Sequence, residues 1–334
     1  MSAAVRLLFA VPALVLLAGG LWLLSRGAGG RPSPGFPSVD GGAFPRTVEL
    51  PTGGTFQVPA PPRRVLLANA SAVDLVTTLI GPERLAAVPK QALRYSRLAD
   101  EPGDFAAVPT FVRFEAEVVL AFEPDLVICD PWAAVETVAR LRELDVAVLT
   151  LPQVSRIDDI ATSLRVLGDV LGVEARAEEV IADLDRRIAR LAERAADRSA
   201  YRALSYSNTG TGGWAAGEGT THHELITLAG LHNAGAGRRD YVRLSFEDLI
   251  AHDPDFIVVG DIGSGVETTS ALLRTEPSLA GLRAVREDRI LRVPARLISS
   301  SSQEIVTGAE FLADAIDRWL AEHEPRRERQ HEGD

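Results

Sequence analysis

The six histidines are the first candidates for metal or acid–base chemistry, and all of them fall in the second half or the tail of the chain. His222 and His223 are adjacent, and adjacent residues of a helix point in different directions, so they do not make a metal-binding pair. No HExxH motif is present. A Zn or Mn ion held between two halves of the protein would also need nitrogen donors from the first half, which has none. The sequence therefore predicts no metal centre.

Other catalytic arrangements are not found either. No Ser-His-Asp or nucleophile-elbow motif is present. The glycine-rich stretch 210–219 lacks a Gly-Lys-Ser/Thr ending, which argues against a nucleotide loop. The only cysteine, Cys129, lies in the apolar run LVIC, as a small core residue does, and it cannot form an internal disulfide. We predict no catalytic residue and no cofactor; an α/β enzyme using Asp130, His222 or Asp261 stays open as an alternative.

Two glutamates carry more information, because each one has the same place in a repeated segment. Residues 114–128 read FEAEVVLAFEPDLVI, and residues 244–259 read LSFEDLIAHDPDFIVV. The alignment matches Glu117 with Glu247, and each copy continues to a Pro-Asp pair. We expect a short amphipathic helix that ends before the proline, followed by an apolar run short enough for a buried parallel strand. Two such copies predict two similar lobes.

Length and composition agree with a protein of two folded lobes. The chain has 334 residues, a formal net charge of −11 and 46% hydrophobic residues. That length allows about two domains, and the apolar content is sufficient for real cores, which excludes a disordered protein. The acidic balance argues against nucleic acid as a partner.

The N-terminal part contains an apolar segment at residues 7–24, with an arginine on either side. Its length fits a membrane span or a long secretory signal, and no cysteine follows it at which a lipid would be attached. Residues 27–45 are rich in Gly and Pro, as a flexible tether is. We predict that residues 1–26 are an anchor or a signal segment. The rest of the protein is then extracytoplasmic, either tethered by residues 7–24 or secreted after cleavage.

The first predicted lobe, residues 46–153, contains the elements that would position the first glutamate. Residues 46–59 alternate around Thr-Gly-Gly and predict a β-hairpin. Strands then alternate with helices, which indicates a mostly parallel sheet. Besides the repeat, strands are expected at 64–68, 85–88 and 146–151, helices at 72–80 and 135–144, and a loop at 89–110.

A helical linker, residues 154–199, is expected between the lobes. Helices are predicted at 157–171 and 174–196, separated by Gly172. The second helix is strongly charged but carries one apolar stripe at helical spacing. Such a long helix between two βα lobes is predicted to be a rigid spine.

The second predicted lobe, residues 200–322, repeats the alternation of strands and helices. It is expected to contain a glycine-rich loop at 208–214 and a serine loop at 299–302 that opens the last helix, 304–320. The tail, residues 323–334, is charged and expected to fray. The predicted fold class is therefore α/β, with two similar lobes, mostly parallel sheets and a cleft between the lobes.

Loop residues of both lobes are candidates for ligand binding, because ligands of open α/β sheets bind beyond the carboxyl ends of the strands. Aromatic residues make up only 6% of the chain, and tryptophans in loops indicate stacking on a planar or bulky ligand. Arginines can hold carboxylates or other anionic groups. The predicted ligand-binding residues are Asn69, Ser71, Tyr95, Phe111, Arg113, Trp132, Trp214, Tyr241, Arg243, Arg296 and Ser300.

Five segments, in their order and spacing, resemble a known family: the periplasmic substrate-binding proteins of ABC importers for iron–siderophore complexes, haem and cobalamin, of the helical-backbone (class III) type. The resemblance runs from about residue 46 to residue 320. The segments are PRRVLLANASAVDLVTTLIG at 62–81, AEVVLAFEPDLVI at 116–128, GEGTTHHELITLAGLHN at 217–233, LSFEDLIAHDPDFIVV at 244–259 and RILRVPARLISSS at 289–301.

The resemblance implies two Rossmann-like lobes joined by one long backbone helix, a ligand in the cleft and modest hinge motion. It also implies a role for Glu117 and Glu247, because family members use one glutamate on each lobe to dock onto arginines of the membrane permease. Two carboxylates far apart on one face can read the spacing and charge of a partner surface. The alternative is that each one merely favours a helix N-terminus electrostatically. Phe111 and Tyr241 stand where the family often places cleft aromatics, and Trp132 lies one or two positions beyond another such place.

The functional hypothesis is an extracytoplasmic solute-binding protein, a monomer, that captures an iron chelate (siderophore), haem or cobalamin and delivers it to an ABC permease without chemistry. One alternative is a metal-ion or oxyanion receptor of the same fold, although the missing histidines of the first half argue against its cation version. Another is a sensory ectodomain that passes ligand occupancy to a membrane partner.

Overall fold

The computed structural model describes residues 35–40, 42–208, 213–261 and 269–331. The apolar segment 7–24 and the beginning of the expected tether lie outside the described residues, so the predictions made for them stay predictions. In the part of the chain that is described, no helix is long and apolar enough to cross a membrane.

The predicted hairpin is confirmed. Strands β2 (Arg46–Glu49) and β3 (Thr55–Val58) pair in antiparallel register, with Arg46 opposite Val58. The turn needs its glycines, because Gly53 and Gly54 have φ values of 88° and 91° in the left-handed region. Strand β1 (Ser38–Val39) adds a third strand beside β2. The end of the expected tether is therefore a paired strand, and not irregular throughout.

The first lobe contains a five-stranded sheet in the order β6-β5-β4-β7-β8. Every neighbouring pair in it is parallel, as the βα alternation predicts. The expected loop 89–110 differs, because it contains three short helical segments, α4, η2 and η3. The elements of this lobe are β4 (Val65–Leu67), α3 (Ala70–Val76), η1 (Pro82–Arg84), β5 (Leu85–Pro89), α4 (Ala92–Tyr95), η2 (Arg97–Ala99), η3 (Gly103–Ala107), β6 (Thr110–Phe111), α5 (Ala116–Leu120), β7 (Leu126–Cys129), α6 (Val135–Glu143) and β8 (Val148–Thr150).

The second lobe contains a six-stranded sheet in the order β12-β10-β9-β13-β14, with β11 also paired to β9. Strands β9, β11, β13 and β14 are parallel, whereas β10 is antiparallel to both of its neighbours. The sheet is thus mostly parallel. The elements are β9 (Arg202–Asn208), β10 (Gly213–Ala216), α9 (Thr221–Leu228), β11 (His232–Asn233), β12 (Tyr241–Leu244), α10 (Phe246–His252), β13 (Phe256–Asp261), α11 (Thr269–Thr275), η4 (Pro277–Leu279), α12 (Arg283–Arg286), β14 (Ile290–Pro294), α13 (Ala295–Ile298) and α14 (Glu304–His331).

Two boundaries in the second lobe differ from the predictions. Trp214 lies on β10, so the expected glycine-rich loop at 208–214 is in part a strand. The last helix does not end at residue 320, because α14 continues to His331 and includes most of the tail that was expected to fray.

The linker forms the two predicted helices, α7 (Ile157–Leu171) and α8 (Glu174–Glu193). Gly172 separates them with a φ of 69°, a left-handed conformation that ends the first helix. Gly168 allows them to pack closely, since a Cβ there would lie 2.7 Å from the Cβ of Ala177. The break at Gly172 is therefore confirmed.

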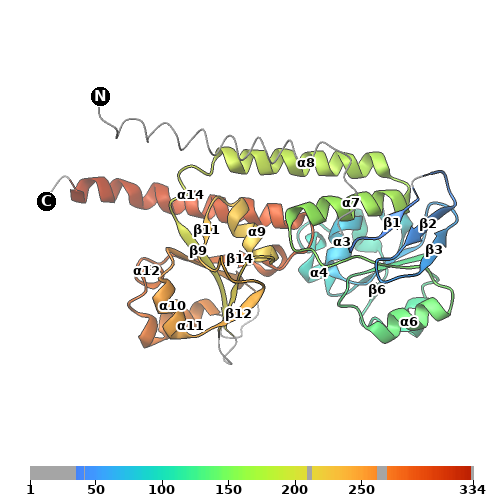
Figure 1. Cartoon of the computed structure of the whole chain (residues 1–334), viewed down its shortest axis with the longest axis horizontal. Helices are drawn as coiled ribbons and strands as arrows, with labels where there is room; N and C mark the ends of the chain where they lie inside the picture. The colour runs from blue at the N-terminus through green and yellow to red at the C-terminus, as the bar shows by residue number, and fades with distance from the viewer. Residues whose placement is uncertain (1–34, 41, 209–212, 262–268, 332–334) are drawn as a thin grey trace. The chain divides into compact units, whose positions relative to one another are not determined.

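Helix α8 is tied to both lobes, as a spine must be, and it lies alongside α7 and α14 (Figure 1). At its N-terminal end Arg176 donates to the carbonyl of Thr78 in the first lobe at 3.0 Å. Further along, Arg187 pairs with Glu310 of α14 at 2.6 Å. Just after its last residue, Arg194 pairs with α14 as well.

The internal repeat has one structural role in both lobes. The residue before each proline adopts the left-handed conformation, with φ 46° at Glu123, just beyond α5, and φ 34° at Asp253, the C-cap of α10. The following aspartate fixes the start of the neighbouring strand. Asp125 accepts from the backbone N–H of Arg64 at 3.0 Å, ahead of β4, and Asp255 accepts from the N–H of Arg202 at 2.9 Å in β9. The prediction of two similar α/β lobes is confirmed.

Candidate ligand-binding site and docking surface

A cavity of about 30 Å³ lies beyond the carboxyl ends of β4, β7 and β8 in the first lobe. The chain runs from β4 to one side of the sheet and returns to the other side at β7, so the cavity stands at the point where the strand order reverses. Ligands of open α/β sheets bind at such a point. We call it the Asn69 cavity. It is lined by Asn69, Ser71, Ala72, Leu75, Cys129, Asp130, Pro131, Trp132, Leu151, Pro152, Gln153, Val154, Ser163 and, from the second lobe, Ser301.

Two polar atoms of the Asn69 cavity are buried and have no hydrogen-bond partner among the described residues: Nδ2 of Asn69 and Oγ of Ser163. The amide orientation of Asn69 is set by its role as the N-cap of α3, where Oδ1 accepts from the N–H of Ala72 at 2.8 Å. Ser163 lies on the buried face of α7 and is 0% exposed. An unpaired buried donor costs free energy, so these atoms mark a place where a further group is expected.

Asp130 and Trp132 follow β7 and form the outer part of the cavity. Asp130 accepts from the backbone N–H of Trp132 at 3.0 Å, and burial raises the pKa of its carboxyl group. The indole of Trp132 is 76% exposed, which leaves a large apolar face at the cavity mouth. The structure thus brings Asn69, Ser71 and Trp132 together, three of the residues that the sequence predicts for ligand binding.

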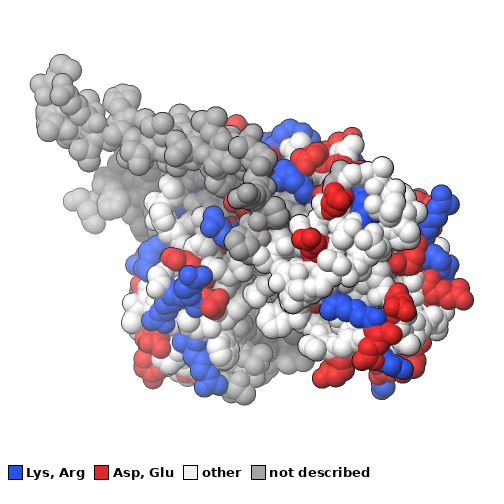
Figure 2. Space-filling model, turned by 45° about the vertical axis from the view of Figure 1, so that its right-hand side comes forward, with Lys and Arg blue, Asp and Glu red and all other residues white. Residues whose placement is uncertain are grey.

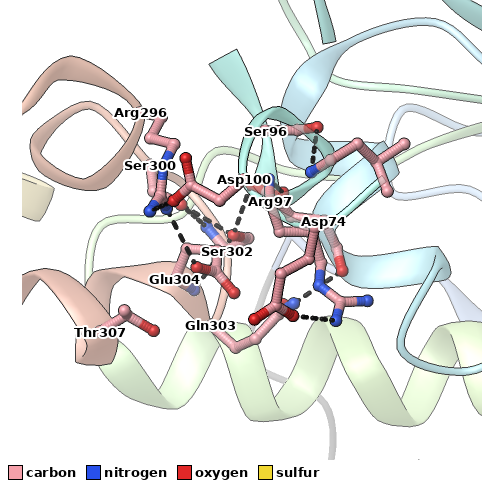
Figure 3. A network of polar contacts seen from close by, with 12 residues as sticks. Asp74, Ser96, Arg97, Asp100, Arg296, Ser300, Ser302, Gln303, Glu304 and Thr307 are labelled. Carbon is pink, nitrogen blue, oxygen red and sulfur yellow. Dashed lines mark hydrogen bonds and ion pairs between the residues drawn. The ribbon is translucent and has the colours of Figure 1, made fainter. Parts of the chain in front are cut away.

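The lobes are joined directly by a network around Asp74, a buried residue of α3 (Figure 3). Its Oδ2 accepts from Ser302 Oγ at 3.1 Å, and its carbonyl accepts from Gln303 Nε2 at 2.6 Å, both just before α14. Its Oδ1 accepts from the N–H of Arg97 at 2.7 Å. Burial is the largest cause that raises the pKa of Asp74, to about 7, and the charge of Glu304 adds to it.

Arg296 and Ser300 belong to the same junction and are occupied there. Arg296 forms an ion pair with Asp100 of the first lobe and a second with Glu304 at 3.6 Å. Ser300 is buried, and its Oγ lies 2.7 Å from that of Ser302. Their surroundings favour a structural role at the junction over the predicted contact with a ligand.

Phe111 requires a correction. It is not a loop residue but the second residue of β6, 5% exposed, and it packs in the first-lobe core against Phe114 and Phe122. The reason is that β6 is the edge strand of the sheet and its apolar side chain closes the core over α5. No part of the ring is free to stack on a ligand in this conformation.

Tyr241 and Trp214 are also on strands, β12 and β10, where sequence analysis places loops. Their side chains are nevertheless exposed, Tyr241 by 47%. Tyr241 meets the edge of the His222 ring at 5.3 Å, and Trp214 lies under the Arg243 guanidinium at 5.5 Å. The ligand-binding prediction for Trp214, Tyr241 and Arg243 stays a prediction.

Tyr95 and Arg113 lie apart from the Asn69 cavity lining. Tyr95 ends α4 and is exposed under the guanidinium of Arg94, at 5.4 Å. Arg113 is exposed and pairs with Glu115 at 3.3 Å. Nothing in their contacts points to a ligand.

A larger cavity, of about 600 Å³, lies beside α8 and contains several arginines. These arginines are paired: Arg176 with Glu179 at 3.0 Å and Arg186 with Asp183 at 3.1 Å. Its charges are therefore satisfied within the protein, in contrast to the donors of the Asn69 cavity.

The residues of the enzyme alternative do not form a catalytic group in the described structure. His222 Nδ1 lies 2.8 Å from Ser205 Oγ inside the second lobe, and burial lowers the pKa of its imidazole to about 4. Asp130 lies in the first lobe, and Asp261 ends β13. Among the described residues, no group of three or more His, Cys, Asp or Glu side chains is placed to hold a metal ion.

Glu117 and Glu247 occupy equivalent places, each the second residue of its helix, α5 and α10. Both are exposed. Within the described part of the chain, neither carboxylate has a hydrogen bond or an ion pair, although arginines are frequent on the surface. On the face shown in Figure 2, charged side chains of both signs are interspersed. The two glutamates are distinguished by their matched positions in α5 and α10.

Ser163 and Asp74 are polar residues that sequence analysis missed. The signal is present in both cases, since each one interrupts an apolar helix face: Ser163 among the buried residues of α7, and Asp74 within the run AVDLV. A buried polar side chain on an apolar helix face needs a hydrogen-bond partner. Such a residue therefore indicates a ligand site or a contact between the lobes.

Comparison with known proteins agrees with this architecture. The profile of the family described as "Periplasmic binding protein" matches residues 67–297. A cobalamin-binding protein of Halobacterium salinarum is 25% identical over 278 residues, covering 82% of this chain and 74% of the relative. The structure of a periplasmic heme binding protein from Pseudomonas aeruginosa has a TM-score of 0.65 and 28% identity, over 76% of this chain and 92% of the other.

A third similar protein is an ABC-type Fe³⁺-hydroxamate transport protein from Saccharomonospora viridis. Its structure has a TM-score of 0.66 at 22% identity, over 82% of this chain and 99% of the other, and at that identity it supports the fold. The relatives are named as binding or transport proteins. With two α/β lobes on a shared helix, a cavity at the strand-order reversal and a profile match over most of its length, this chain belongs to the periplasmic binding protein family.

Proposed function

We propose that this protein is an extracytoplasmic receptor that holds a large metal chelate, such as haem, a corrinoid or a ferric siderophore, and delivers it to an ABC permease. It performs no chemistry on the ligand. The family supplies the general activity, which is binding of a small molecule for an ABC transporter. The choice of a chelate is supported by two relatives, whose names refer to cobalamin and heme.

The observation that carries the delivery step is the matched pair Glu117 and Glu247. Each lobe presents one carboxylate at the same register of the same helix–strand unit, exposed and without a partner among the described residues. Two like charges at a fixed separation suit a partner with two matching cations, and a permease built from two related subunits offers such a surface. A helix N-terminus alone would favour an acidic residue, but it would not require the same register in both lobes.

The ligand is proposed to rest against Trp132. Its exposed indole stands at the mouth of the Asn69 cavity, whose lining also includes a residue of the second lobe, Ser301. Large planar ligands stack on aromatic faces, so a chelate in this position would contact both lobes. We further propose that the protein acts as a monomer and that residues 7–24 hold it at the membrane or direct its secretion.

A fluorescence titration tests the function. Trp132 is a sensitive reporter because it is exposed where the ligand would stack. The protein is titrated with cobalamin, haem and several ferric siderophores, with Zn and Mn salts as controls. Saturable quenching by one chelate, at a Kd of about 1 μM or below, supports the proposal. A response to the bare ions alone would assign the protein to metal-ion receptors instead.

A further inference from the structure

We infer that the Asn69 cavity receives a neutral primary-amide arm of the bound chelate and discriminates against a carboxylate arm. This inference rests on the proposed function, since it assumes a chelate against Trp132, and it specifies the chemical class of that chelate. The ring is expected outside the cavity, because a volume of about 30 Å³ has room for the end of a side chain only.

The donors of the cavity call for a hydrogen-bond acceptor. Asn69 presents Nδ2, because its Oδ1 is used by the N–H of Ala72, and Ser163 presents Oγ. Both atoms are buried, and neither has a partner in the described structure. A carbonyl oxygen has two lone pairs and can accept from both donors. An apolar arm would leave them unpaired and is therefore disfavoured.

The charge of the cavity calls for an arm that is not anionic. Among the described lining residues, Asp130 is the one carboxylic acid, and none is a lysine, an arginine or a histidine. A ligand carboxylate would be placed beside a like charge without a compensating cation. Burial already raises the pKa of Asp130, and a second carboxylate would increase that electrostatic cost.

Two of the predicted ligand-binding arginines, Arg296 and Arg243, do not supply a cation to the cavity. Arg296 is held by Asp100 and Glu304, and Arg243 lies over Trp214. A primary amide resolves both requirements at once. Its carbonyl oxygen accepts from Asn69 and Ser163, and its N–H group donates to Asp130.

The first test compares ligands that share a ring and differ only in their arms. One pair is a corrinoid with all side chains as amides and the same corrinoid with those amides hydrolysed to carboxylates. The other pair is haem and haem with both propionates converted to amides. In each pair we expect the amide form to bind about 10- to 100-fold more tightly, as for a buried polar group that gains its partners.

Variants locate the discrimination in the cavity. Ser163→Ala removes a donor that bonds to nothing in the described structure, so the free energy of unfolding should stay the same or rise. The affinity for the amide ligand should fall about 3- to 10-fold. Asn69→Asp keeps the N-cap oxygen for Ala72 and removes the Nδ2 donor. Asp130→Asn should reduce the preference for amide over carboxylate, because it removes the like charge.

The matched control is Thr162→Ala. Thr162 precedes Ser163 on α7, but its hydroxyl donates within the helix to the carbonyl of Asp158 at 3.0 Å. It does not line the cavity, so affinity should not change.

The outcomes separate this inference from the proposed function. If chelates bind but the carboxylate forms bind as tightly as the amide forms, the inference is wrong and the receptor function stands. The same holds if Asp130→Asn leaves the preference for the amide form unchanged, or if Ser163→Ala leaves the affinity for the amide ligand unchanged. If neither pair binds but a ferric siderophore does, the inference is wrong and the receptor function stands. If no corrinoid, haem or ferric siderophore binds, both the function and the inference are contradicted.

Discussion

Ser302 donates a hydrogen bond to the carboxylate of Asp74 at 3.1 Å, and this bond joins the start of α14 in the second lobe to α3 in the first. Asp74 is almost fully buried. Burial, and to a smaller extent Glu304, raise its pKa to about 7, against the lowering effect of the Arg97 N–H and charge. The contact between the lobes therefore contains a group that titrates near neutral pH.

The stability of the protein should depend on pH through Asp74. The folded protein keeps a proton on Asp74 at pH values where the unfolded chain, with a pKa of 3.8, has lost it. This contribution to stability is complete below about pH 4 and is lost as pH rises through about 7. Between pH 5 and pH 8 it amounts to about 2 to 3 kcal/mol. Urea unfolding at the two pH values should show that Asp74→Asn, which has nearly the same shape, loses less stability than the unaltered protein. Equal losses would contradict the assignment.

Reversal of both matched glutamates should abolish delivery without affecting capture. In Glu117→Lys/Glu247→Lys, the repulsion replaces the attraction toward a cationic partner surface, and neither side chain contacts the Asn69 cavity. Transport into cells should fall to background, while the Kd for the chelate in a fluorescence titration stays within about twofold. Glu193→Lys, at the end of α8, is the control and should transport normally. Uptake that survives the double reversal would exclude the docking role.

Two adjacent arginines of α8 should differ in their effect on stability. Arg187 donates to Glu310 and Thr307 of α14 at 2.6 and 2.8 Å and is partly buried, whereas Arg186 pairs with Asp183 on an exposed surface. Arg187→Ala should lower the free energy of unfolding by about 1 to 3 kcal/mol, and Arg186→Ala by less than about 0.5 kcal/mol. Chemical denaturation of both variants measures the difference. Similar values would show that the spine is not fixed by this contact.

Phe111 and Tyr241 each lie three residues before a copy of the repeat, but their environments are opposite. Phe111→Ala should cost about 3 to 5 kcal/mol, because it removes a ring from the first-lobe core. Tyr241→Ala should cost about 1 kcal/mol, since nearly half of the side chain is exposed. If Tyr241 contacts the chelate, only its variant combines nearly full stability with reduced affinity. Thermal unfolding and ligand titration of the same samples test both statements.

The parts of the fold that depend on local sequence could be predicted. The helix before each Pro-Asp, the turn at Gly53 and Gly54 and the break at Gly172 are set by neighbouring residues. The parallel order of the first sheet follows from the βα alternation. Strands β10 and β12 could not be predicted in the same way, because a glycine-rich segment has weak strand propensity and β10 is stabilised by pairing with residues distant in sequence.

The candidate site could be predicted only in part, for the same physical reason. Asn69 and Trp132 each follow a strand, so the rule for carboxyl ends identifies them. Ser163 lies on α7, far beyond β7 in the chain, and only the packing of α7 brings it to the cavity. The sequence around Arg296 likewise does not indicate that Asp100 is its partner, since that ion pair forms only when the two lobes meet.

Because α8 is tied to both lobes and the lobes are cross-linked at Asp74 and Arg296, we expect ligand entry to require little rearrangement. We expect the distance between Glu117 and Glu247 to be nearly the same in the empty and the loaded receptor. A transporter that measures this distance would not distinguish the two, and empty receptors would occupy it in competition with loaded ones. The rate of uptake should then fall when the receptor is produced in large excess over its ligand.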